Sequence, residues 1–215
     1  MWSPADIVDA AAAGLVRAAQ AMDLEDAVRG LDDLPERAVQ QTLASAFTEA
    51  GWIVAREVRY PSSRPRSKAA GARCDLVLTL DAPLQPDAEA SLFDPVDPAP
   101  AESACWIEVK VAAAMDAEGA SPAYARTLSH TAIADAAVLA SETHLHHAML
   151  LLVLFGRDEA TLRQDVRAWA DEALMAGVHT ETPRVRIFAL RERRGNTAAA
   201  VVGVPIRRAA GDITN

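Results

Sequence analysis

The sequence predicts an α/β fold with a mixed central β-sheet flanked by helices. Hydrophobic residues recur with the 3.6-residue period of helices in some segments and with the two-residue period of strands in others. The run at 147–155 (HAMLLLVLF) is almost unbroken in its apolar character, which is typical of a strand covered on both faces and favours a parallel neighbour. These patterns give the order α-α-β-β-β-α-β-α-β-β, in which helices can cover both faces of one sheet.

Two helices are expected before the first strand. Residues 4–21 carry an apolar stripe at helical spacing, with Ser3 as a suitable N-cap and Pro4 at the first helical position. Residues 34–50 form the second helix, and Gly51 suits its C-terminal end. The apolar side chains of this second helix recur at Val39, Leu43, Phe47 and Ala50.

Three strands follow, at 52–60, 74–80 and 105–111, where the hydrophobic period changes to two. The first connection, 61–73, has the composition of a loop and is basic. The second connection, 81–104, contains five prolines and six acidic residues, so we expect a flexible acidic insertion there.

The C-terminal half of the chain alternates between helices and strands. A helix is expected before the apolar run and an amphipathic helix after it, and two final strands are joined by a glycine-containing turn. These elements are expected at 122–141 for the first helix, 147–155 for the apolar strand, 158–175 for the second helix, and 184–193 and 197–206 for the final strands.

The chain has 215 residues, which is enough for one good hydrophobic core. We expect an N-terminal helical extension at 1–33, one domain at 34–208 and a loose tail at 209–215. The net charge of −9 argues against a protein that coats nucleic acid nonspecifically. No run of 18 apolar residues is present and the N-terminal segment lacks a basic region. We therefore expect a cytoplasmic protein without a membrane span.

A charged pair interrupts the third strand, CWIEVKV. Strand side chains alternate between faces, so Glu108 and Lys110 share one face. Burying a charged pair on a strand of core character costs free energy unless the charges are neutralised or serve a function. The preceding strand, in RCDLVLTL, opens with Asp75. The pair is therefore either a structural ion pair or, together with Asp75, a metal and phosphate site. The opposite face of CWIEVKV is apolar, with Cys105, Ile107, Val109 and Val111.

The element order over about residues 34–156, together with these charged residues, resembles the PD-(D/E)xK nuclease superfamily. The resemblance rests on an acid in the first helix of the core, Glu36, on Asp75, and on the acid-x-lysine pair Glu108 and Lys110. Cys74 stands where the name of the superfamily has proline, and that proline is often absent. The resemblance implies a restriction endonuclease-like αβββαβ core and an endonuclease that hydrolyses phosphodiester bonds, most often in DNA.

Mg²⁺ is the cofactor that the resemblance and the side-chain chemistry imply, with Mn²⁺ as an alternative. Asp75, Glu108 and the backbone carbonyl of Val109 are the expected ligands. Lys110 is expected to orient the attacking water or to stabilise the developing charge. Glu36 would reach a metal-bound water or hold Lys110.

Further candidates surround these residues. Gln40 lies one helical turn after Glu36, and Glu57 on the first strand is either an additional acid of the site or a solvated strand residue. Nucleic-acid contact is expected from the basic loop that leads to Asp75, at Arg64, Arg66, Lys68 and Arg73. A second basic group is formed by Arg191, Arg193, Arg194, Arg207 and Arg208.

The leading hypothesis is a Mg²⁺-dependent endonuclease that acts on DNA, as a homodimer if both strands of a duplex are cut. The alternative is a catalytically inactive binding or assembly subunit of a larger DNA-processing or defence complex, which the acidic net charge favours. In an intermediate case the chain is catalytic and needs a partner protein, either an ATPase or a DNA-recognition subunit.

Overall fold

A computed structural model of the chain describes residues 2–61, 72–84 and 98–208. It is a mixed α/β protein with a six-stranded sheet in the order β1-β2-β3-β6-β8-β7. Only β3 and β6 run parallel, and the other neighbours are antiparallel. The strands, in sheet order, are β1 (Ile53–Arg59), β2 (Arg73–Thr79), β3 (Cys105–Ala113), β6 (His147–Gly156), β8 (Ala198–Pro205) and β7 (Arg184–Ala189).

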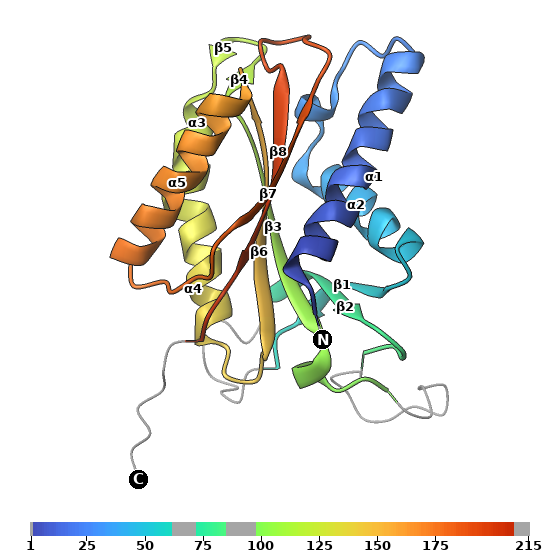
Figure 1. Cartoon of the computed structure of the whole chain (residues 1–215), viewed down its shortest axis with the longest axis vertical. Helices are drawn as coiled ribbons and strands as arrows, with labels where there is room; N and C mark the ends of the chain where they lie inside the picture. Colours follow the sequence, from blue (N-terminus) through green and yellow to red (C-terminus); the bar gives the residue numbers. More distant parts are fainter. Residues whose placement is uncertain (1, 62–71, 85–97, 209–215) are drawn as a thin grey trace.

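Helices cover both faces of this sheet (Figure 1). Two helices, α1 and α2, pack on one face, while α3, a π-helical segment, α4 and α5 pack on the other. The strand β6 lies between β3 and β8 and is buried along almost its whole length, which confirms the parallel neighbour expected for the apolar run. The helical elements are α1 (Pro4–Leu24), α2 (Glu36–Glu49), α3 (Pro122–Arg126), the π segment (Thr127–Ala132), α4 (Ile133–Ser141) and α5 (Glu159–Met175).

The N-terminal helix α1 shares its core with α2 and the sheet. Ser3 caps it by accepting from the Asp6 backbone N–H at 3.3 Å, and Pro4 occupies the first helical position. The helix contacts α2, β7 and β8. Val8 lies against Gly203 of β8, where a Cβ atom would approach the valine to 2.4 Å. The described part of the expected extension, residues 2–33, therefore contributes apolar side chains to the same core as α2 and the sheet.

Two local differences from the expected elements occur. A small hairpin of β4 (Met115–Asp116) and β5 (Gly119–Ala120) follows β3. It was not predicted, because strands of two residues show no detectable period in the sequence. The final hairpin is shorter than expected, and β7 ends at Ala189. Two arginines that follow β7 form ion pairs with acidic residues at or just after the end of α1: Arg191 with Asp26 and Arg193 with Asp23.

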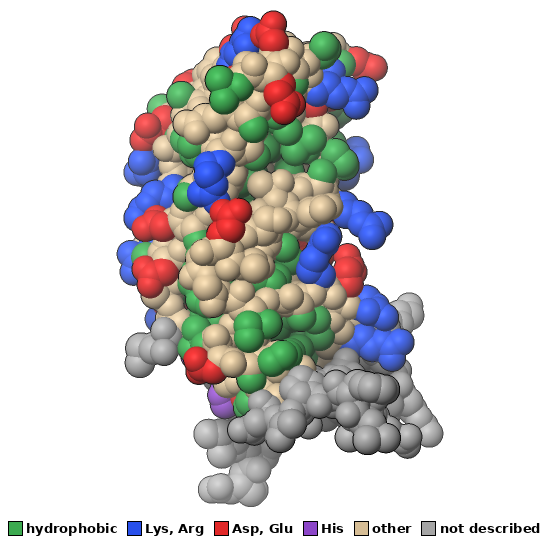
Figure 2. Space-filling view, turned by 90° about the vertical axis from the view of Figure 1, so that its right-hand side faces the viewer, with side chains coloured by type: hydrophobic (Ala, Val, Ile, Leu, Met, Phe, Trp, Pro, Cys, Tyr) green, Lys and Arg blue, Asp and Glu red, His purple; other side chains and the backbone are tan. Residues whose placement is uncertain are grey.

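The face covered by α1 carries charges of both signs (Figure 2). Basic side chains stand along both edges of this face, and acidic side chains lie among them, between apolar patches. Among the described residues, no helix has the length and apolar character needed to cross a lipid bilayer.

Candidate functional site

The predicted site lies where β2 and β3 separate. The two strands pair only at Leu78–Cys105, Val77–Trp106 and Leu76–Ile107. The next residues in this register are Asp75 and Glu108. Beyond this point β3 continues on β6 as far as Ala113, while its other edge has no strand partner in the described part of the chain.

Two carboxylates take the place of the missing strand. The Val109 backbone N–H donates to Asp75 Oδ2 at 2.8 Å, and the Val111 backbone N–H donates to Glu36 Oε2 at 3.2 Å. Unpaired backbone N–H groups in a protein interior are costly, so both acids stabilise the free edge of β3. The N-terminal turn of α2 brings Glu36 to this edge. The structure thus places Glu36, Asp75 and Glu108 around one short stretch of strand.

Glu108 is buried beside a second carboxyl group. Its side chain is turned toward the α4 side of the sheet, and only 7% of the residue is exposed. Burial raises the pKa of Glu108 to about 9, and the charge of Asp75 and a hydrogen bond with it act in the same direction. The Tyr60 hydroxyl donates to Glu108 Oε1 and opposes this rise. Without a cation, Glu108 therefore holds a proton at neutral pH.

Lys110 is held by carboxylates from both faces of the sheet. Its Nζ lies 2.9 Å from Asp135 Oδ2 on α4 and 3.4 Å from Glu36 Oε1 on α2, and it also donates to the Val109 carbonyl at 3.2 Å. Burial lowers the pKa of Lys110, but the hydrogen bond and charge of Asp135, with Glu36 and Asp75, raise it above its ordinary value. Lys110 is therefore an ammonium that donates hydrogen bonds.

Sequence reasoning did not assign Tyr60 and Asp135 to the site. Tyr60 follows β1 and stacks on Trp106, with ring centroids 5.8 Å apart and 22° between the planes, which aims its hydroxyl at Glu108. Asp135 is the only acidic residue between positions 122 and 141, and this isolation on an otherwise apolar helix is a usable sequence signal. Tyr60 had no comparable signal, because its role depends on where β2 and β3 separate.

The other candidates lie outside this group of contacts. Gln40 is buried on α2, but in the part of the chain that the structure describes no hydrogen bond joins its side chain to the carboxylates. Glu57 is exposed and has a positive φ of 53°. Arg73 donates from Nη1 to the Glu57 carbonyl at 2.6 Å, which ties its side chain back to β1.

The basic loop is only partly described. Arg64, Arg66 and Lys68, expected to contact nucleic acid, lie outside the described residues, as do positions 85–97 of the acidic insertion and the tail at 209–215. The second basic group is largely neutralised, because four of its five arginines form ion pairs: Arg191 with Asp26, Arg193 with Asp23, Arg194 with Asp33 and Arg207 with Glu181.

The donor set at the strand separation fits Mg²⁺, although it is small. No three His, Cys, Asp or Glu side chains within the described ranges are placed to hold a metal ion. Mg²⁺, however, is commonly held by one or two carboxylates and completes its shell with waters and substrate phosphate. Asp75 and Glu108 supply two such groups. Burial and, after it, the charge of Asp75 raise the pKa of Glu108, and a bound cation would offset both effects. The Val109 carbonyl is already engaged by Lys110.

A comparison with protein-family models, curated proteins and solved structures found no match. The geometry at the strand separation is therefore the ground on which a function is proposed.

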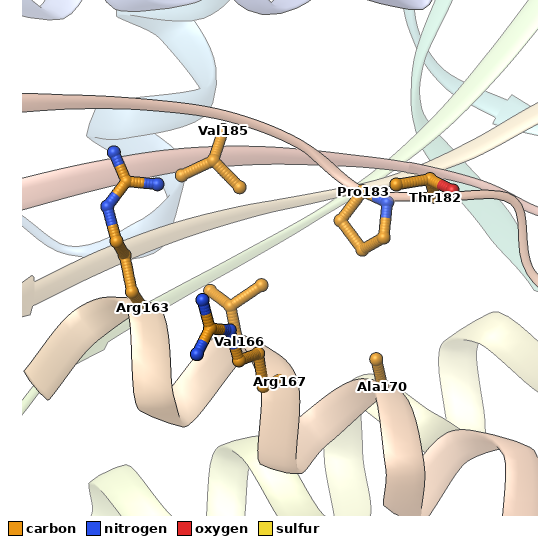
Figure 3. Close-up of a pocket in the computed structure, with 7 residues that line it drawn as sticks. All are labelled: Arg163, Val166, Arg167, Ala170, Thr182, Pro183 and Val185. Carbon is orange, nitrogen blue, oxygen red and sulfur yellow. The ribbon is translucent and has the colours of Figure 1, made fainter. Parts of the chain in front are cut away.

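A mostly apolar hollow lies elsewhere, between α5 and the segment that leads into β7 (Figure 3). It has a volume of about 230 Å³ and is lined by Val166 on α5, by Pro183 and Val185 on the facing segment, and by Arg163 and Arg167 of α5. None of its lining residues belongs to the carboxylate group. This hollow is therefore separate from the candidate site, which lies where β2 and β3 separate.

Proposed function

We propose that this protein is a Mg²⁺-dependent endonuclease of the PD-(D/E)xK kind, which hydrolyses phosphodiester bonds in DNA. One observation carries the proposal: Asp75 and Glu108 face each other where two strands separate, and Lys110, two residues on, stands beside them as a hydrogen-bond donor. The succession of α2, β1, β2 and β3, followed after a short hairpin by helices and β6, supports the proposed αβββαβ core.

The residues divide the work of phosphodiester hydrolysis. A Mg²⁺ ion would supply charge neutralisation at the phosphoryl group and acidification of the attacking water. Asp75 and Glu108 are the residues that would hold this ion, with the Glu108 carboxyl in its ionised form. Lys110 donates a hydrogen bond toward the negative charge that develops on the phosphoryl oxygens, in a partly buried position where such a contact is stronger than in water. Glu36 holds Lys110 and the β3 edge in place.

Cleavage of plasmid and single-stranded DNA in Mg²⁺ or Mn²⁺ tests the proposal. Asp75→Asn retains an oxygen that can accept from the Val109 N–H but removes the negative charge, and Lys110→Ala removes the donor. We expect both variants to lose at least about a hundredfold in kcat. Asp165→Asn is the matched control, because Asp165 also accepts a partly buried hydrogen bond, from the Tyr124 hydroxyl at 2.7 Å, outside the site. Equal cleavage by the wild-type protein and both site variants would overturn the proposal.

A second candidate function is a catalytically inactive binding or assembly subunit. It is favoured by the fact that the charged groups already have partners within the protein. Asp75 and Glu36 accept hydrogen bonds from backbone N–H groups, and Lys110 forms ion pairs with Glu36 and Asp135. Calorimetric titration with Mg²⁺ and Mn²⁺ separates the two functions. Heat of binding that disappears in Asp75→Asn supports the nuclease, and no heat with the wild-type protein at millimolar metal supports the assembly subunit.

DNA as substrate, a homodimer and a partner ATPase or DNA-recognition subunit stay predictions. Sedimentation of the chain alone and with duplex DNA tests the first two. Cutting both strands of a duplex in one encounter requires two sites, so a monomer that makes double-strand breaks without nicked intermediates would contradict the dimer.

A further inference from the structure

We propose that Asp135 is a positioning residue that fixes the Lys110 ammonium in the gap between β2 and β3. The inference rests on the proposed nuclease function for its catalytic consequence. The contact itself joins α4 to β3, through two residues that lie 25 positions apart in the chain. Asp135 approaches from the face of the sheet opposite to Glu36, so Lys110 is gripped from two sides.

Lys110 needs such a grip. A lysine side chain has four rotatable bonds and loses considerable conformational entropy when it is held in one conformation. Its side chain is only 13% exposed, so water contributes little to holding the ammonium in place. A contact that fixes the Nζ before substrate arrives removes that entropic cost from the reaction itself.

Asp135 is the closer of the two carboxylates. Its Oδ2 lies 2.9 Å from Lys110 Nζ, against 3.4 Å for Glu36 Oε1. Glu36 divides its carboxylate between the lysine and the Val111 N–H, and its side chain is 38% exposed. The Asp135 side chain is 27% exposed, so its contact is less screened by solvent. Asp135 is therefore the main anchor of Lys110.

The helical segment before Asp135 fixes the position of its carboxylate relative to Lys110. The expected helix 122–141 is interrupted by the π segment, which contacts β3 and ends three residues before Asp135. A π turn adds a residue to the turn of a helix and is frequently found at functional positions. Leu128 and Ala132 of this segment are buried against the sheet, which sets the height of α4 over Lys110. The carboxylate thus stands on a packed element, as a positioning residue requires.

Lysine acetylation offers a direct readout, because the chain has two lysines, Lys68 and Lys110. The metal-free protein is treated with limiting acetic anhydride, and the two rates are measured by mass spectrometry, with Lys68 as the internal reference. In Asp135→Asn we expect the Lys110/Lys68 rate ratio to rise about tenfold or more, the factor that corresponds to loss of a hydrogen bond between charged groups. In the control Asp165→Asn the ratio should stay as in the wild-type protein.

Steady-state cleavage and Mg²⁺ titration give the catalytic readout. We expect Asp135→Asn to lower kcat about 10–100-fold, with KM and the Mg²⁺ dissociation constant changed less than about threefold. Asp135→Glu keeps the charge and should recover part of kcat. A residue that only stabilised the fold would lower the amount of active protein without producing this split.

Three results overturn or separate the claims. An unchanged Lys110/Lys68 ratio in Asp135→Asn overturns the inference. A loss of Mg²⁺ affinity that parallels the loss of kcat also overturns it, because Asp135 would then be a metal ligand. If the wild-type protein cuts no DNA while the ratio still rises, the proposed nuclease function fails and the anchoring of Lys110 by Asp135 stands.

Discussion

Replacing Glu108 by glutamine should change how the stability of the metal-free protein depends on pH. The pKa of Glu108 rises from 4.5 to about 9 on folding, mainly because the group is buried. Between these two values the folded protein holds a proton that the unfolded chain releases. A raised pKa means that this contribution to stability is fully present below about pH 4.5 and is lost as the pH rises toward 9.

The size of the effect follows from the shift. Each pH unit inside this window costs about 1.4 kcal/mol of unfolding free energy, which amounts to on the order of 3 kcal/mol at pH 7. The Glu108→Gln amide cannot ionise, and its carbonyl can still accept from the Tyr60 hydroxyl. The variant should therefore be more stable than the wild-type protein at pH 7–8, and the difference should shrink toward pH 5.

Urea unfolding followed by tryptophan fluorescence, in EDTA at pH 5, 6, 7 and 8, measures this difference. The exposed Glu118 serves as the control, and Glu118→Gln should give a curve parallel to that of the wild-type protein. Millimolar Mg²⁺ should stabilise the wild-type protein at pH 7–8 and leave Glu108→Gln nearly unchanged. Parallel pH curves for the wild-type protein and Glu108→Gln would refute the reasoning, because Glu108 would then titrate as an exposed carboxylate.

Three further predictions follow from contacts in and around the core. Asp75→Ala leaves the Val109 N–H without its acceptor and should cost about 1–3 kcal/mol more in urea unfolding than Asp75→Asn; equal stabilities would contradict a structural role for this carboxylate. Burial raises the pKa of Cys74 and raises that of Cys105 to about 12, so iodoacetamide at pH 8 should modify neither thiol until urea is added. Gly14→Ala would place a Cβ 2.3 Å from the Cβ of Ala46 and should lower the unfolding free energy by about 1–3 kcal/mol, whereas an unchanged Tm would show that α1 and α2 can separate freely.

The sequence was sufficient for the main helices and strands and for most of the charged group. Strand alternation alone places Glu108 and Lys110 on one face, and an antiparallel neighbour with Asp75 near its start brings the second acid opposite the first. Glu36 was predicted because the resemblance implies an acid in the first helix of the core, and the structure places it in the first turn of α2. These predictions depend on local periodicity and on one strand pairing, which are the properties that sequence patterns encode most directly.

The features that the sequence did not predict depend on tertiary geometry or on very short strands. Tyr60 reaches Glu108 only because β2 and β3 separate after Leu76–Ile107, and no periodicity in either strand marks that point. Asp135 reaches Lys110 through the height of α4 over the sheet, which the π segment helps to set. The short hairpin β4–β5 has two residues in each strand, too few for a two-residue period to be recognised.

The contact between Val8 and Gly203 ties the start of the described chain to one of its last strands. During synthesis, α1 leaves the ribosome long before β8 exists, and at usual elongation rates the interval is roughly 10–40 s. For that time the buried side of α1, with Ile7, Val8, Ala11 and Leu15, has no sheet to cover it. We therefore expect the nascent chain to expose the apolar side of α1 until its final hairpin emerges, and the packing of β7 and β8 on α1 to be a late step of folding.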